Sequence, residues 1–163
     1  MRDNLFRGRL TERFADAPKM RPDLVERGII KGGFVYGSLV ADDKRCFICI
    51  AAFAGNQSYV NNAYATMFEV DPETVGQYTG LTDKNGVKIF EGDIIEGHCH
   101  SRWNHELKKC VIAYDKDHFE ARHYINNADN DYYTYKTLFS KDVVVIGNIY
   151  DSPELLEGGE INA

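Results

Sequence analysis

Cysteine and histidine are the residues of this chain whose types and spacing could bind a metal. Cys46 and Cys49 have the C-x-x-C spacing of a zinc-ligand pair, and residues 98–110 could supply a second pair. The candidates there are His98, Cys99, His100, His105 and Cys110. The apolar run Cys46 to Phe53, however, predicts a strand that sends the two cysteines to opposite faces. We therefore favour reduced thiols acting as small apolar side chains, without a structural disulfide, over zinc or redox chemistry.

His98 and His100 would share one face of a strand, so they could hold a catalytic metal with an open coordination position. A third ligand could come from Glu96, His118 or His123, and a protein with such a site would be a metal-dependent hydrolase. The spacing fixes none of these three, and histidines at the polar end of a strand are more commonly solvated or paired. The hydrolase stays an alternative, and we assign no catalytic, metal-binding or cofactor-binding residue.

Three carboxylates, Glu91, Asp93 and Glu96, lie within six residues. Glu91 and Asp93 flank a glycine in a predicted turn, where the expected role of a carboxylate is to accept backbone N–H bonds. The chain also lacks a nucleophile elbow and a phosphate-binding glycine loop. The sequence therefore leaves enzymatic activity undecided and favours a non-catalytic protein, and it predicts no cofactor.

Tyrosines gather late in the chain and could stack the bases of single-stranded nucleic acid. Only Arg122 and Lys136 lie nearby as basic residues, and the net charge of -6 would repel a phosphate backbone. We keep this as a second alternative and favour a protein-contact surface, because tyrosine buries much area at little entropic cost. The tyrosines are Tyr124, Tyr132, Tyr133 and Tyr135.

Short apolar runs alternate with polar turns along most of the chain. Asn85-Gly86 predicts a hairpin turn, because both residue types accept positive φ. Aspartate-rich and asparagine-rich segments separate the later runs and favour turns. The near-regular spacing suggests a small barrel or sandwich. The later runs of strand length are 109–114, 118–124, 132–139 and 143–150.

The N-terminal part combines strands with a short helical segment. Residues 34–40 and 46–53 predict a hairpin, and we assign residues 59–70 to a strand, although the pattern also permits a helix. Between them and the N-terminus, Thr11 could cap a helical turn ended by Pro18, and Pro22 could open a second turn that Gly28 closes.

These elements predict three parts. Residues 1–74 form an N-terminal β-rich unit with a helical insertion at about 10–31, residues 75–152 form a small β-barrel, and residues 153–163 form an acidic flexible tail. The turn Asp71-Pro72-Glu73-Thr74 marks the boundary between the first two.

Two long segments carry a resemblance to a known family: TVGQYTGLTDKNGVKIFEGDII at Thr74 to Ile95 and VVVIGNIYDSPELL at Val143 to Leu156. With FRGR at Phe6 to Arg9 and FVYGSLV at Phe34 to Val40, they resemble the YopX-like proteins encoded by phages and prophages. The resemblance implies a C-terminal barrel of the Src-homology-3 type, multimeric assembly and no established activity. It supplies no catalytic residue, and a fold of this kind hosts many functions.

Charge and hydropathy limit where and how the protein acts. No window approaches the roughly eighteen apolar residues of a membrane span, and the N-terminus lacks the apolar stretch of a signal peptide, so we expect a cytoplasmic protein. Residues 1–31 carry eight Lys and Arg against five Asp and Glu. That asymmetry could steer head-to-tail contact between subunits. We expect a mainly β, non-catalytic module that binds protein, either itself or a host or phage factor, inside a bacterium.

Overall fold

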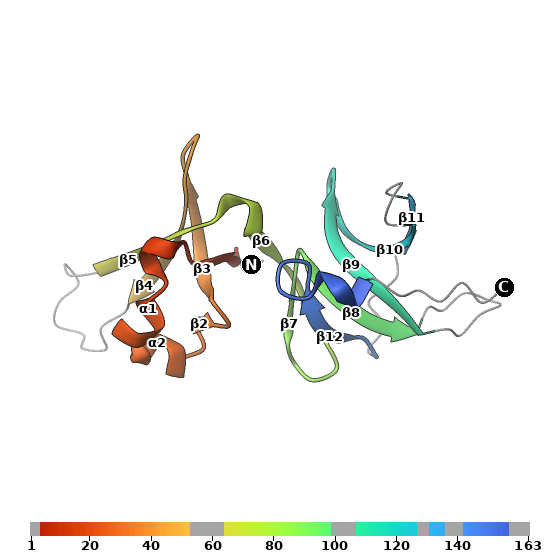
Figure 1. Cartoon of the computed structure of the whole chain (residues 1–163), viewed down its shortest axis with the longest axis horizontal. Coiled ribbons are helices and arrows are strands. Elements are labelled where there is room, and N and C mark those ends of the chain that lie inside the picture. Colours follow the sequence, from red (N-terminus) through yellow and green to blue (C-terminus); the bar gives the residue numbers. More distant parts are fainter. Residues whose placement is uncertain (1–3, 53–63, 99–106, 127–130, 136–141, 157–163) are drawn as a thin grey trace. The chain divides into compact units, whose positions relative to one another are not determined.

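The computed structural model describes residues 4–52, 64–98, 107–126, 131–135 and 142–156 (Figure 1). The fold is mainly β, as predicted, and the chain divides into two compact units, Met1–Gln77 and Tyr78–Ala163. Each unit has its own hydrophobic cluster. In the described residues no helix is both long and apolar enough to span a bilayer.

The first unit is built on an antiparallel sheet with the strand order β5-β4-β3-β1, and β2 pairs with β3. The first residues of β6 (Gly76–Thr82) pair with β1. The predicted hairpin is confirmed as β3 and β4, and the described part of residues 59–70 is a strand, β5. The other bounds are β1 (Phe6–Arg9), β2 (Ile30–Lys31), β3 (Phe34–Ala41), β4 (Cys46–Ala52) and β5 (Tyr64–Val70).

The predicted helical segment consists of η1 (Glu12–Phe14), α1 (Ala17–Met20) and α2 (Pro22–Glu26). Pro22 opens α2, and Gly28 follows it with a φ of 68°, so the second predicted turn is confirmed. The prediction that Pro18 ends a helix is wrong. Pro18 lies in the first turn of α1, where its missing N–H costs no intrahelical hydrogen bond.

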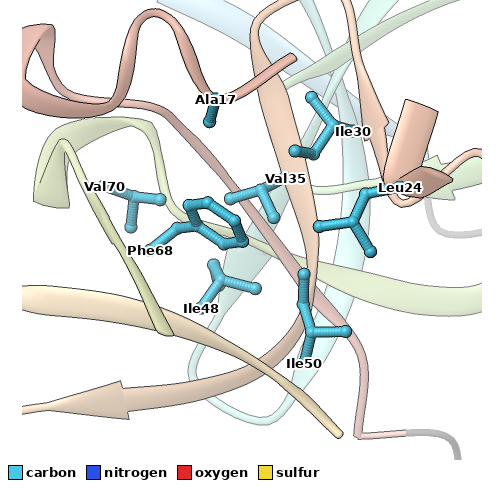
Figure 2. Close-up of a cluster of buried hydrophobic side chains, with 8 residues drawn as sticks. All are labelled: Ala17, Leu24, Ile30, Val35, Ile48, Ile50, Phe68 and Val70. Atoms are coloured by element: carbon cyan, nitrogen blue, oxygen red, sulfur yellow. The ribbon is translucent and has the colours of Figure 1, made fainter. Parts of the chain in front are cut away.

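The core of the first unit lies where these helices pack on one face of the sheet. Ile48 of β4 lies beside Phe68 of the neighbouring strand β5, and Ile50 of β4 belongs to the same cluster (Figure 2). Leu24, which is 1% exposed, comes from α2. Burying a side chain of this size contributes about 1.5–3 kcal/mol. Short helices that could not persist alone are therefore held by burial rather than by propensity.

The second unit contains a five-stranded antiparallel sheet with the order β11-β10-β9-β8-β12. The later part of β6 also pairs with β7. Among the described residues nothing pairs β11 with β12, so the predicted closed barrel is not confirmed. The bounds are β7 (Lys88–Phe90), β8 (Asp93–His98), β9 (Leu107–Asp115), β10 (His118–Asn126), β11 (Asp131–Tyr135) and β12 (Val144–Asn148). Two 3₁₀ turns, η2 (Pro72–Thr74) and η3 (Pro153–Leu156), complete the described elements.

Candidate functional site

The first unit carries apolar side chains on the face of its sheet that points away from the core. Successive residues of a strand point to opposite faces, so Phe47 and Cys49 lie opposite the buried Ile48. The strand pairing places Val40 beside Phe47 and Met67 beside Cys49. We call Val40, Phe47, Cys49 and Met67 the outer face.

The outer face is partly open to solvent. Val40 is 45% and Met67 43% exposed, while Phe47 and Cys49 are half-buried. The Arg45 guanidinium lies 5.4 Å from the centre of the Phe47 ring. These side chains offer apolar area and a cation at the margin, which suits protein contact.

Cys46 and Cys49 lie within β4, so the predicted strand through the C-x-x-C segment is confirmed. Cys46 packs against the core from one face, and Cys49 belongs to the outer face. Both are free thiols, as is the buried Cys110 of β9. Within the described ranges, His, Cys, Asp and Glu side chains form no group of three that could hold a metal ion.

The proposed hydrolase histidines are only partly within the described residues. His98 ends β8, but its side chain is not described. The other candidates from that stretch, Cys99, His100 and His105, lie outside the described residues. Glu96, a suggested third ligand, lies in β8 opposite Lys109 of β9.

His118 and His123 do not converge on a common point. They are five residues apart in β10 and therefore point to opposite faces of the strand. His118 Nδ1 lies 2.9 Å from Asp117 Oδ1, and its Nε2 lies 3.9 Å from Glu120 Oε2. His123 Nδ1 lies 2.9 Å from the Lys109 carbonyl oxygen. Both histidines thus have local partners.

Glu120 is the buried carboxylate of this strand, with 5% of its surface exposed. Its Oε1 accepts a hydrogen bond of 2.5 Å from Arg122 Nε. His118, Glu120 and Arg122 share one face of β10, opposite the core residue Ala121.

Asp93 and Asp83, both within the segment Thr74 to Ile95, accept hydrogen bonds from backbone N–H groups. Asp93 is 1% exposed, and its Oδ2 accepts a 2.7 Å hydrogen bond from the Phe90 N–H, which confirms its predicted turn role. Between Phe90 and Asp93, Gly92 has a φ of 80°, and its N–H donates to the Ile112 carbonyl of β9. The turn between β7 and β8 is therefore bonded to β9 of the five-stranded sheet.

Asp83, which the sequence analysis did not single out, joins its turn to β12. Its carboxylate accepts N–H bonds from Asn85 at 2.8 Å, Val87 at 2.9 Å and Val145 of β12 at 3.1 Å. Burial alone would raise the pKa of Asp83, but these three donors and the nearby Lys84 outweigh it and lower the pKa below its ordinary value. An aspartate two residues before Asn-Gly, at the start of a turn, was the available signal.

The Asn85-Gly86 turn differs from the prediction in one respect. Gly86 has a φ of 80°, whereas Asn85 is not among the described residues with positive φ. Asp83 explains the difference, because its side chain accepts the N–H groups of Asn85 and Val87 and sets the backbone between them. The turn therefore needs one left-handed residue instead of two.

The tyrosine-rich segment is described at backbone level only. β11 pairs with β10, so that Tyr133 lies opposite His123. The side chains of Tyr124, Tyr132, Tyr133 and Tyr135 lie outside the described residues. The stacking platform and the tyrosine contact surface both stay predictions.

The chain was compared with known proteins. The family described as "YopX protein" matches residues 38–157. No curated protein matches the chain in sequence. A solved structure, protein EF1440 from Enterococcus faecalis, is 26% identical with a TM-score of 0.39 over 73% of this chain and 85% of that chain.

Proposed function

The chain belongs to the YopX protein family, whose match spans residues 38–157, and on this premise we propose that it is a non-catalytic module that binds protein or assembles with itself. We further propose that this chain is a phage-derived or prophage-derived protein that acts in the cytoplasm of a bacterial host. Its partner is a second copy or a host or phage protein.

The observation that carries the proposal is the outer face. Val40 and Met67 expose apolar side chains from neighbouring parts of one sheet, and Phe47 and Cys49 lie between them in the strand order. Contiguous apolar area on a sheet is a feature of protein contacts, whereas singly exposed apolar residues need no explanation. Aspartates that might have suggested catalysis, Asp83 and Asp93, instead bind backbone N–H groups.

The test uses two valines of matched exposure. Val40→Lys places a charge on the outer face, and Val25→Lys places the same charge on α2, where Val25 is 43% exposed. The protein is expressed at native level in its bacterial host and captured after nuclease treatment. A stoichiometric protein, or a second copy, that is retained by Val25→Lys and lost from Val40→Lys supports the proposal. Equal retention by both variants contradicts it.

We also propose that residues 75–152 form a barrel of the Src-homology-3 type, separate from residues 1–74. The support is the return of β12 to pair with β8, which places the last strand of the sheet beside the first. Closure would bring the edge strands β11 and β12 together. Backbone contacts between these strands in a nuclear Overhauser spectrum would establish closure, and solvent-exchanging amides along both edges would oppose it.

Neither alternative function gains a supporting observation. The metal-dependent hydrolase needs a third ligand beside His98 and His100, and the described candidates His118 and His123 point to opposite faces of β10. Binding of single-stranded nucleic acid needs basic side chains, and residues 78–163 carry nine Lys and Arg against fifteen Asp and Glu.

A further inference from the structure

We propose that Asn85 is a site of spontaneous deamidation, that the folded turn holds the reaction back, and that conversion to isoaspartate detaches this turn from β12. The sequence contains one Asn-Gly pair, Asn85-Gly86, and it lies in the turn between β6 and β7 of the second unit. The inference is independent of the proposed function, because it involves no residue of the outer face.

Deamidation of an Asn-Gly pair needs only the chain and water. The Gly86 backbone nitrogen loses its proton and attacks Cγ of the Asn85 side chain. A bond forms between these two atoms, the bond from Cγ to the side-chain nitrogen breaks, and that nitrogen leaves with the proton as ammonia. Water then opens the cyclic imide at either carbonyl carbon, which gives aspartate or isoaspartate. Glycine favours the attack, because it has no side chain beside the attacking nitrogen.

Asn85 and Gly86 are both exposed, but the nitrogen that must attack is held in the turn. Gly86 N–H donates to the Asp83 carbonyl oxygen at 3.0 Å. The peptide groups on either side are held as well, since the N–H groups of Asn85 and Val87 both donate to Asp83 Oδ1. Attack requires rotation about the bond between the Asn85 Cα and carbonyl carbon, and this rotation breaks at least one of the three hydrogen bonds. Asp83 therefore keeps the attacking nitrogen away from Cγ.

The turn is also joined to β12 and to the residue before it, which limits local opening. Asp83 Oδ2 accepts the Val145 N–H at 3.1 Å, and Lys84 N–H donates to the Val143 carbonyl at 3.0 Å. Asp83 is 6% exposed, so water does not take over these bonds without opening the turn. Segments of a folded protein open with free energies that reflect such bonds and burial. We therefore expect Asn85 to react when the turn is released from β12.

Conversion to isoaspartate makes the release permanent. The Cβ atom of residue 85 enters the main chain, so the backbone between Asp83 and Val87 gains a carbon atom. The N–H groups of Gly86 and Val87 then cannot both keep their bonds to Asp83. The product also places a second carboxylate close to that of Asp83, and like charges repel. The modified turn should therefore lose its connection to β12 and weaken the second unit.

The experiment follows the full chain during incubation in mildly alkaline buffer, using peptide mass spectrometry with chromatographic separation of isoaspartate. In the folded parent, Asn85 should convert at least about tenfold more slowly than in the same chain unfolded in urea. Asn148 is the internal reference, because the branched Ile149 that follows it hinders attack in both samples. A folded parent whose Asn85 converts as fast as that of the unfolded chain overturns the proposal.

Variants of Asp83 test its positioning role. Asp83→Ala removes the side-chain acceptor and should convert Asn85 about tenfold faster than the parent. Asp83→Asn keeps an acceptor oxygen and should give a rate between the two, while Asp42→Ala, in an exposed turn of the first unit, should leave the rate unchanged. Far-ultraviolet circular dichroism checks folding, and Asp83→Asn carries the comparison if Asp83→Ala does not fold. Folded Asp83 variants that convert no faster than the parent contradict the role of Asp83.

The product gives an independent reading. The isoaspartate form of the parent, separated by ion exchange, should unfold at a lower temperature than the unmodified form. Hydrogen exchange should show the loss of protection at the Val145 amide, which donates to Asp83. An isoaspartate form with unchanged unfolding temperature and unchanged exchange at Val145 would overturn the detachment from β12.

Discussion

The two sheets of this protein carry different kinds of side chain on the faces turned away from their cores. In the second unit that face of β10 carries an ion pair between Glu120 and Arg122, and His118 Nε2 lies 3.9 Å from the Glu120 carboxylate. In the first unit it carries Val40 and Met67, which expose apolar surface without a described partner. We therefore propose the first unit as the place of protein contact, although the longest family segment lies mostly in the second.

The largest expected effect on stability comes from truncating a side chain on the core face of β4, compared with one on its outer face. Ile48→Ala removes a fully buried side chain beside Phe68 and should lower the free energy of unfolding by about 3 kcal/mol. Cys49→Ala, on the outer face, should cost less than about 1 kcal/mol. Urea unfolding measures both, and hydrogen exchange should place the Ile48→Ala loss within residues 4–77. Equal losses for the two variants would show that the outer face is covered.

A smaller effect is expected from the aspartates that organise the turns of the two units. Asp83→Ala leaves three backbone N–H groups without their acceptor and should cost about 2–3 kcal/mol. Asp42→Ala is the matched control, because Asp42 accepts the N–H groups of Lys44 and Arg45 in an exposed turn where water can replace it. Its cost should stay below about 1 kcal/mol. Chemical denaturation compares them, and similar losses would contradict a tertiary role for Asp83.

The same comparison shows how far sequence reasoning reaches. Strand positions follow from local patterns, so β3, β4, β9 and β10 fall where alternating or apolar runs predicted them. Pro18 was misplaced because a proline fits both the end of one helix and the first turn of the next. The turn at Asn85-Gly86 was predicted, but the bond from Val145 to Asp83 spans 62 positions, and no local pattern encodes it.

The outer face was missed for a related reason. The cysteine spacing drew attention to Cys46 and Cys49, and the strand alternation that separated them also placed Phe47 on the face of Cys49. Which of the two faces is buried depends on the position of α2, whose Leu24 joins the core. A short helix packed by tertiary contact cannot be assigned to one face of a sheet from its own sequence.

Acid should weaken the second unit through Asp83. Its pKa is lowered in the folded protein, so its stabilising contribution is complete above the ordinary value of 3.8 and is lost as the pH falls through the folded pKa. Asp83→Asn keeps an acceptor but cannot titrate, so the variant should be less stable than the parent at neutral pH and should approach it in acid. Thermal unfolding from pH 6 to pH 2 measures the difference. A gap that does not narrow would assign the acid sensitivity to other carboxylates.

The smallest effect on stability is expected on the outer face itself, and it is the most informative for function. Val40→Lys and Val25→Lys replace valines of nearly equal exposure, so each should change the free energy of unfolding by less than about 0.5 kcal/mol. Their stabilities should match while their association differs, because only Val40 lies on the sheet face continuous with β5. A clear loss of stability in Val40→Lys alone, at concentrations where the protein is monomeric, would mean that Val40 packs within its own chain. The contrast between the two units would then be one of packing, not of binding.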